Sequence, residues 1–158
     1  MALKNCKSAI IFSSVTGNTR ELIEIINSEF HRYAIFPAIY PADIFPLQDL
    51  KKFDAIIVGT YTWGNGNIPK EMVPIFQAFE QQDVKNTVTG VVGTGDSFYP
   101  YFCGAVDEFR DMLFLHSTLA VTLKVELRPQ EKDLTRCKRF VEAIVKRLEL
   151  QQQKYSLL

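Results

Sequence analysis

Hydroxyl side chains and a glycine gather directly after the first apolar run of the chain, in the segment 13–19. Ser14, Thr16 and Thr19 supply hydroxyl groups, and Gly17 lets the backbone approach a ligand closely. The segment leads into a helical pattern, so free backbone N–H groups and the helix dipole would favour an anion here. We therefore expect a phosphate group at this loop. A plain helix cap, which serine and threonine also form, is the alternative.

The same segment lacks the signatures of common nucleotide sites. No Gly-Lys-Ser/Thr follows it, as in a Walker A loop, and it is not the G-x-G-x-x-G of dinucleotide folds. The preceding strand ends in serines, where a phosphoacceptor receiver domain needs paired acids. No lysine or arginine lies between Ser8 and Thr19, so neutral donors would hold the phosphate.

Aromatic and glycine residues mark two further loops, at 60–67 and 94–103. Trp63, the only tryptophan, stands in a polar, glycine-flanked loop, which indicates a stacking surface for a planar ligand. A tryptophan folded down as a loop plug is the alternative. The later loop carries four aromatic residues and Asp96, which suits the polar edge of a pyrimidine-like ring. Cys103 has no histidine nearby and is interpreted as a buried apolar residue.

Short apolar runs alternate with longer segments of helical periodicity, and this order positions the three loops. We expect strands at 8–12, 34–40, 54–59, 88–92 and 119–127, and helices at about 22–30, 68–79, 104–115 and 131–150. Pro37 limits the second strand to the edge of a sheet. Repeated β-α units predict a three-layer α/β fold with a mostly parallel sheet. Ligands bind such sheets beyond the carboxyl ends of the strands, where the three loops lie.

The composition fits one domain spanning 1–158, with a frayed tail at 151–158. Its 18 Lys+Arg balance 18 Asp+Glu, and a zero net charge argues against nucleic-acid or membrane-surface binding. No apolar run approaches about 18 residues and no signal-peptide pattern begins the chain. Cys6, Cys103 and Cys137 form neither a disulfide framework nor a C-x-x-C site, and the two histidines predict no metal site. A reducing cytoplasm is the expected compartment.

Three segments taken together resemble flavodoxin. They read S-V-T-G-N-T at Ser14–Thr19, G-T-Y-T-W-G at Gly59–Gly64 and G-D-S-F-Y-P-Y-F-C-G-A-V-D at Gly95–Asp107, in order and at compatible spacing. The resemblance covers about Ser8 to Leu148, and the lack of an insertion near 119–127 is similar to the short-chain type. It implies the flavodoxin-like fold, a five-stranded parallel sheet of order 2-1-3-4-5 with helices on both faces. Flavodoxin is itself the reference example of this order, with FMN at the switch point.

The resemblance also implies a role for individual residues. The hydroxyl and N–H groups of residues 14–19 would hold the FMN phosphate, and Trp63 and Tyr99 would flank the flavin ring. The backbone around Gly95 and Asp96 would bind its pyrimidine edge, and the Gly64–Asn65 peptide would turn its carbonyl toward N5–H in the semiquinone. The FMN contacts expected in this way are Ser14, Val15, Thr16, Gly17, Asn18, Thr19, Tyr61, Thr62, Trp63, Gly64, Asn65, Thr94, Gly95, Asp96, Tyr99, Phe102 and Cys103.

The function implied is low-potential, one-electron transport by a protein that is not an enzyme. A ferredoxin/flavodoxin-type NADP reductase and acceptor redox proteins would dock at the exposed flavin edge of a cytoplasmic monomer. One alternative is a small FMN-dependent reductase or a ribonucleotide-reductase-activating flavoprotein. Another is a binding module that has kept the fold and lost the flavin.

The chain departs from the family in its charge. Flavodoxins are usually strongly acidic, and they often carry acids where this chain has Asn65 and Asn67. Residues 132–154 hold seven Lys+Arg against three Asp+Glu. We expect a less negative second flavin couple than in acidic relatives, and weaker steering toward a basic reductase.

Overall fold

The computed structural model describes residue 3 and residues 5–156. The strands are β1 (Ser8–Phe12), β2 (Ala38–Pro41), β3 (Ala55–Tyr61), β4 (Val84–Gly95) and β5 (Ser117–Glu126). The α-helices are α1 (Asn18–His31), α2 (Val73–Gln81), α3 (Gly104–His116) and α4 (Glu131–Ser156). Short 3-10 turns form at η1 (Ala42–Ile44), η2 (Leu47–Lys52) and η3 (Lys70–Met72).

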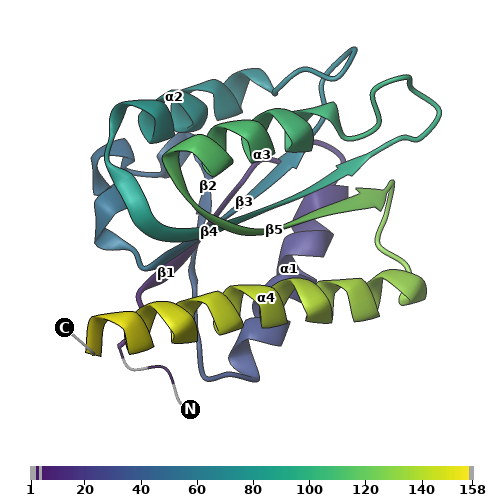
Figure 1. Ribbon diagram of the computed structural model, residues 1–158. Helices are drawn as coiled ribbons and strands as arrows, with labels where there is room; N and C mark the ends of the chain where they lie inside the picture. Colours follow the sequence, from purple (N-terminus) through teal and green to yellow (C-terminus); the bar gives the residue numbers. More distant parts are fainter. Residues whose placement is uncertain (1–2, 4, 157–158) are drawn as a thin grey trace.

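The strands form one parallel sheet between two layers of helices. Its order is β2-β1-β3-β4-β5, and every described pair of neighbours is parallel. Helices α1 and α4 cover one face, and α2 and α3 cover the other (Figure 1). Along β1, Ile10 packs toward α1 and α4 while Ile11 packs toward α2 and α3, because successive strand residues face opposite sides. The predicted three-layer fold and strand order are confirmed.

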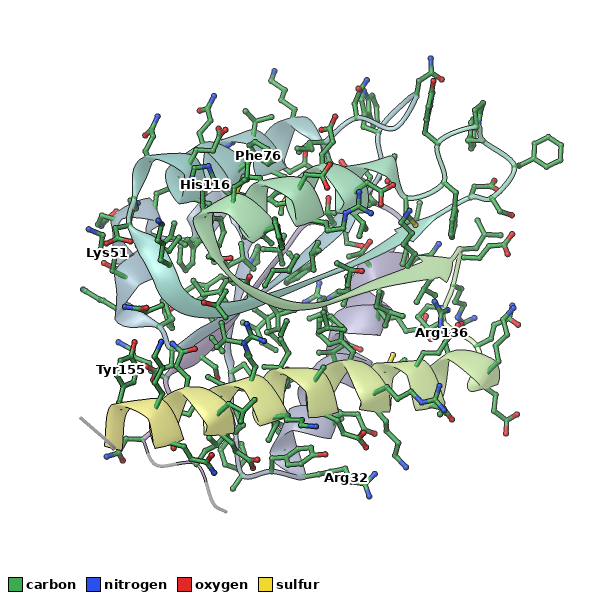
Figure 2. The ribbon with its side chains drawn as sticks, in the orientation of Figure 1. Arg32, Lys51, Phe76, His116, Arg136 and Tyr155 are labelled. Atoms are coloured by element: carbon green, nitrogen blue, oxygen red, sulfur yellow. The ribbon has the colours of Figure 1, made fainter. Side chains whose placement is uncertain are left out.

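Aromatic packing fixes the layer formed by α2 and α3. The ring of Phe76, labelled in Figure 2, meets Phe109 edge-on, with ring centroids 5.2 Å apart. Phe109 is fully buried, and so is Phe79 of α2. This packing anchors α3, whose first residues reach the candidate site.

The second strand is shorter than its apolar run predicts. β2 spans only Ala38–Pro41 and pairs with β1 alone, so it is the edge strand that Pro37 indicates. The preceding residues belong to the turn that ends α1. There the Ala34 N–H donates to the His31 carbonyl, and Ala34 has φ +57°. The strand expected at 34–37 is therefore wrong.

Two helices also differ from their expected bounds. In the segment 68–79, residues 68–69 precede any helix, η3 follows, and the chain becomes α-helical only at Val73, because Pro74 lacks an N–H and is tolerated only in a first turn. The frayed tail expected from Gln151 is wrong for residues 151–156, since α4 continues through them. The Gln151 amide donates to the Asn86 carbonyl of β4, which holds this end of the helix. The rest of the expected tail, 157–158, lies outside the described residues.

β5 forms one edge of the sheet. It pairs with β4 on one side, and no other described strand pairs with it. Its register against β4 shifts between Thr89 and Gly90, so Ala120 has no partner residue of its own. Among the described residues, no helix is at once long and apolar enough for a membrane crossing.

Candidate functional site

Three loops follow β1, β3 and β4 at the carboxyl edge of the sheet. These strands are neighbours, so the loops emerge side by side. The buried hydroxyls of Thr19 and Thr94 lie 2.8 Å apart across 75 residues of sequence. The fold therefore joins the start of α1 directly to the end of β4.

Ser14 shapes the first loop. Its hydroxyl oxygen accepts hydrogen bonds from the N–H groups of Gly17, at 3.2 Å, and Arg20, at 3.3 Å. Gly17 has φ +91°, which glycine adopts without a steric penalty. The oxygen of Ser14 therefore caps the start of α1, as the helix-cap alternative predicts. Its hydroxyl hydrogen can still donate to a ligand. Val15 and Thr16 are exposed, so the loop opens to solvent at the positive end of α1.

Two arginines are paired with acids in the first turns of α1. Arg20 lies 3.8 Å from Glu24, and Arg128 lies 2.9 Å from Glu21. An anion at the start of α1 would therefore meet hydroxyl and backbone donors rather than a free cation.

The second loop closes as a hairpin that presents Trp63. Trp63 and Asn67 exchange two backbone hydrogen bonds of 2.8 and 2.7 Å. Between them Gly64 and Gly66 have φ +53° and +95°, which the tight turn requires. The Trp63 side chain is 62% exposed, so it is a surface group and not a loop plug.

Asp96 organises the third loop. One of its carboxylate oxygens accepts from the Phe98 N–H at 2.9 Å, and its carbonyl accepts from the Tyr99 N–H at 3.1 Å. The Ser97 hydroxyl donates to the carboxylate of Glu126 at the end of β5. Asp96 thus holds its own loop in shape, a role that the sequence did not indicate.

A hollow of about 210 Å³ lies between the second and third loops. Its lining residues are Thr62, Gly64, Gly95, Asp96, Tyr99, Tyr101 and Cys103. All but Tyr101 were predicted from the sequence. Buried pockets for small molecules usually measure about 300–1,000 Å³. The smaller volume suits a planar ring that keeps one edge in solvent.

Several predicted residues lie outside this hollow. Trp63 is not among its lining residues, and Phe102 packs against the core beneath α2 and α3. Cys103 touches the hollow but is only 1% exposed, and burial raises the pKa of its thiol to about 12. It is the buried, unreactive cysteine that the sequence predicts.

Glu71 also belongs to the candidate site, although it was not predicted from the sequence. One oxygen of its carboxylate accepts from both the Ser13 hydroxyl and the Tyr61 hydroxyl, each at 2.5 Å. Burial raises the pKa of Tyr61 to about 12, together with the hydrogen bond from its hydroxyl to Glu71 and the negative charge of Glu71. Burial opposes ionisation of Glu71, but the two hydroxyl donors lower the pKa of its carboxyl. Tyr61 was expected to contact the ligand, whereas its hydroxyl is bonded to Glu71.

No signal in the sequence marks Glu71. An acid in the first turn of an amphipathic helix is ordinary, and its partners lie 58 and 10 residues away. Among the described residues, no group of three or more His, Cys, Asp or Glu side chains is arranged to hold a metal ion.

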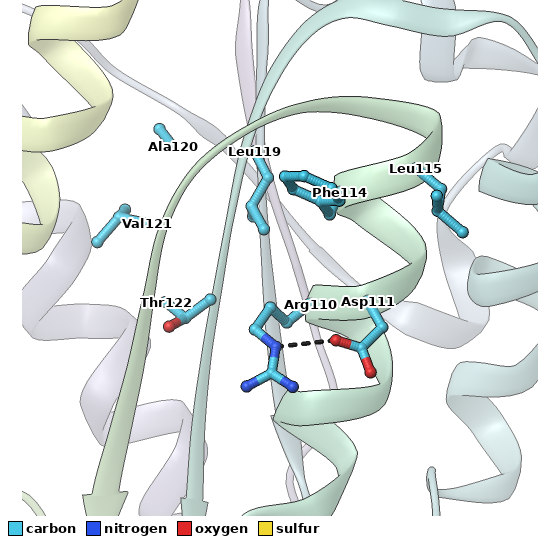
Figure 3. A pocket seen from close by; sticks show the side chains of 8 residues that line it. All are labelled: Arg110, Asp111, Phe114, Leu115, Leu119, Ala120, Val121 and Thr122. Carbon is cyan, nitrogen blue, oxygen red and sulfur yellow. Dashed lines mark hydrogen bonds and ion pairs between the residues drawn. The ribbon is translucent and has the colours of Figure 1, made fainter.

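A hollow of about 570 Å³ lies elsewhere, between the second half of α3 and β5 (Figure 3). Phe114, Leu115, Leu119 and Val121 give it an apolar lining, and Arg110 pairs with Asp111 at 2.9 Å beside them. None of the predicted site residues lines it. We attribute its size to the open edge of β5, so volume alone does not identify the functional site.

Known proteins resemble this chain over most of its length. The flavodoxin family model matches residues 10–140. Probable flavodoxin 1 of Bacillus subtilis (strain 168) is 32% identical over 143 residues, which cover 88% of this chain and 90% of that protein. The flavodoxin of Streptococcus pneumoniae TIGR4 superposes with a TM-score of 0.85 at 30% identity, covering 90% of this chain and 99% of the other.

A structure containing the cofactor shares the fold. A mutant flavodoxin of Fusobacterium nucleatum, solved with flavin mononucleotide bound, superposes with a TM-score of 0.75 at 16% identity, over 89% of this chain and 96% of that one. The family match spans most of the chain, and the strand order agrees with it. The chain therefore belongs to the flavodoxin family of FMN-binding, one-electron carriers, which are electron-transfer proteins and not enzymes.

Proposed function

We propose that this carrier holds FMN across the three loops, with the phosphate at the start of α1 and the ring at the 210 Å³ hollow. The observation that carries the proposal is the position of these two features at one edge of the sheet, joined by the Thr19–Thr94 bond. The hydroxyls of Ser14 and Thr16 and the N–H groups of residues 15–16 and 18–19 would hold the phosphate, since the Gly17 N–H is bonded to Ser14. When bound, FMN supplies the one-electron redox chemistry.

The residues around the hollow suit a planar ring. Trp63 and Tyr99 stand on separate loops, 62% and 58% exposed, and would cover the two ring faces and exclude water from them. The backbone at Gly95 and Asp96 would meet the polar ring edge. Thr62, Gly64 and Cys103 line the same hollow and would complete the surroundings of the ring.

Redox partners would dock around the same loops. Phe98 and Tyr101, in the same loop as Tyr99, are 94% and 63% exposed, so apolar side chains are available on this loop for a partner. We propose that an NADP-dependent reductase of the ferredoxin/flavodoxin type and acceptor redox proteins bind this surface in turn. Asn65 and Asn67 put no charge on the hairpin, which supports a less negative second couple than in acidic relatives.

The three cysteines support a cytoplasmic location. Cys6, Cys103 and Cys137 are all free thiols, as in a reducing compartment. We propose that the carrier works there as a monomer, which size-exclusion chromatography at low and high protein concentration tests.

The test of the FMN site compares two neighbouring aromatic residues. Tyr99→Ala should weaken FMN binding by roughly fivefold, equivalent to about 1 kcal/mol for a lost aromatic stack. Phe98→Ala is the matched control, since Phe98 belongs to the same loop but does not line the hollow. FMN fluorescence quenching on titration with apoprotein measures both. Equal affinity of Tyr99→Ala and wild type would contradict the ring position.

The test of the carrier function is reduction of the loaded protein. An anaerobic reductive titration should show two separate one-electron steps. NADPH should reduce the protein only after a reductase is added. Rapid reduction by NADPH alone would contradict the carrier function and favour a reductase.

A further inference from the structure

Glu71 joins the beginnings of two loops of the proposed FMN site. Ser13 directly follows β1 and precedes the phosphate loop, while Tyr61 ends β3 and precedes the hairpin of Trp63. The two strands are neighbours, and the Ser13 N–H donates to the Gly59 carbonyl at 3.0 Å. One carboxylate oxygen on η3 therefore bonds to the side chains at both loop origins.

The bonds to Glu71 are of a strong class. A hydrogen bond to an ionised acceptor is roughly twice as strong as a neutral one. Ser13 is 7% exposed, so without the carboxylate its hydroxyl would lose its partner in a mostly water-free place. A carboxylate only accepts, so it also fixes the direction of both hydroxyl groups.

The position of this cluster gives it a role in ligand binding. Ser14 and Thr62 are the next residues along the chain, and each begins a segment that would contact a different part of FMN. The Thr62 hydroxyl in turn accepts from the Ala105 N–H at 3.2 Å, which ties the hairpin to α3. Fixing Ser13 and Tyr61 relative to each other sets the spacing between the phosphate loop and the hairpin.

We propose that Glu71 is a positioning residue for FMN, which holds the phosphate loop and the ring-flanking hairpin at the separation the cofactor needs. The proposal rests on the FMN site proposed above. Glu71 acts through Ser13 and Tyr61.

The test measures FMN affinity in variants that separate the acceptor from the charge. Glu71→Ala removes both bonds and should raise the Kd for FMN about tenfold, equivalent to about 1.4 kcal/mol. In Glu71→Gln the amide oxygen still accepts from both hydroxyls, so the Kd should stay within about threefold of wild type. Glu80→Ala is the matched control, because Glu80 is an exposed acid near the other end of α2. Circular dichroism first establishes a temperature at which every apoprotein is folded.

Each outcome decides the proposal. In a Tyr61→Phe background, Glu71→Ala should cost less affinity than in wild type, since one of its bonds is already lost. Wild-type affinity in Glu71→Ala would overturn the positioning role. An equal loss in Glu71→Gln and Glu71→Ala would assign the effect to charge and overturn it as well. A wild-type chain and a Glu80→Ala chain that both fail to bind FMN would overturn the proposed function together with this inference.

Discussion

The contact between the hairpin and α3 makes a specific prediction for Gly104→Ala. A Cβ added at Gly104 would lie 2.7 Å from the Cα of Gly66, 2.8 Å from its carbonyl oxygen and 3.1 Å from its carbonyl carbon. All three are backbone atoms, so no side chain can rotate out of the way. Real Cβ contacts are not shorter than 3.0 Å and ordinary ones begin at 3.4 Å, so the hairpin must move by about 0.3–0.7 Å.

Two opposing effects set the size of the change. Alanine is favoured over glycine inside a helix by about 1 kcal/mol, and by less in a first turn such as this. Overpacking a tight contact costs about 1–3 kcal/mol, so the steric term wins. A net loss of about 1 kcal/mol lowers the Tm of a domain of this size by about 2–4 °C. Displacement of the hairpin that presents Trp63 should also weaken FMN binding.

The assay uses Trp63 as an internal reporter, since it is the only tryptophan. Gly104→Ala should lower the apoprotein Tm, change the Trp63 emission and raise the Kd for FMN. Gly17→Ala is the comparison, because a Cβ at Gly17 meets no atom within 4 Å and is strained only by φ +91°. It should lower stability but leave the Trp63 emission unchanged. A Gly104→Ala protein with wild-type Tm, emission and FMN affinity would refute the reasoning.

Three further predictions concern buried or partly buried groups. Thr19→Val and Thr94→Val should each lower the free energy of unfolding by about 1–3 kcal/mol, because each leaves the other buried hydroxyl unpaired. The double variant should lose less than the sum of the two single losses. Additive losses in urea unfolding would contradict this pairing. Burial, with the nearby charge of Asp54, raises the pKa of Cys6 to about 11 from 9.0. Its thiolate fraction at pH 8 therefore falls roughly hundredfold, and iodoacetamide should modify it far more slowly in the folded protein than in urea, as mass spectrometry can show. Asp133→Ala should lower the Tm by several degrees for a loss of about 1–2 kcal/mol, because Asp133 accepts from both the Gln130 N–H and Arg136. The exposed Glu131→Ala should leave the Tm unchanged, and equal melting of the two variants would contradict this role of Asp133.

The features best predicted from sequence are those that neighbouring residues determine. The Gly17 turn, the hairpin of Gly64 and Gly66 and the buried character of Cys103 all follow from local residue types, and the structure shows each of them. The strand order came with the family resemblance, since periodicity alone does not order strands.

The features that were missed depend on contacts between distant segments. Glu71 reaches Ser13 across 58 residues, and the Gln151 amide reaches Asn86 across 65, so no local pattern marks either bond. The strand at 34–37 was wrong because apolar residues there complete the turn after α1 and leave only Ala38–Pro41 to pair. The roles of Ser14 and Asp96 were missed for a different reason, since each residue uses acceptor atoms to bond neighbouring residues of its own loop.

The course of α4 has a practical consequence for work with this protein. The helix starts beside the end of β5, near Arg136 in Figure 2, and its last turns lie by Asn86 near the other end of β4. The last turns of α4 therefore lie at the amino ends of the strands, at the edge of the sheet opposite the three loops (Figure 1). A tag or tether attached after the last turn of α4 would orient the molecules on an electrode or resin with their loops facing outward.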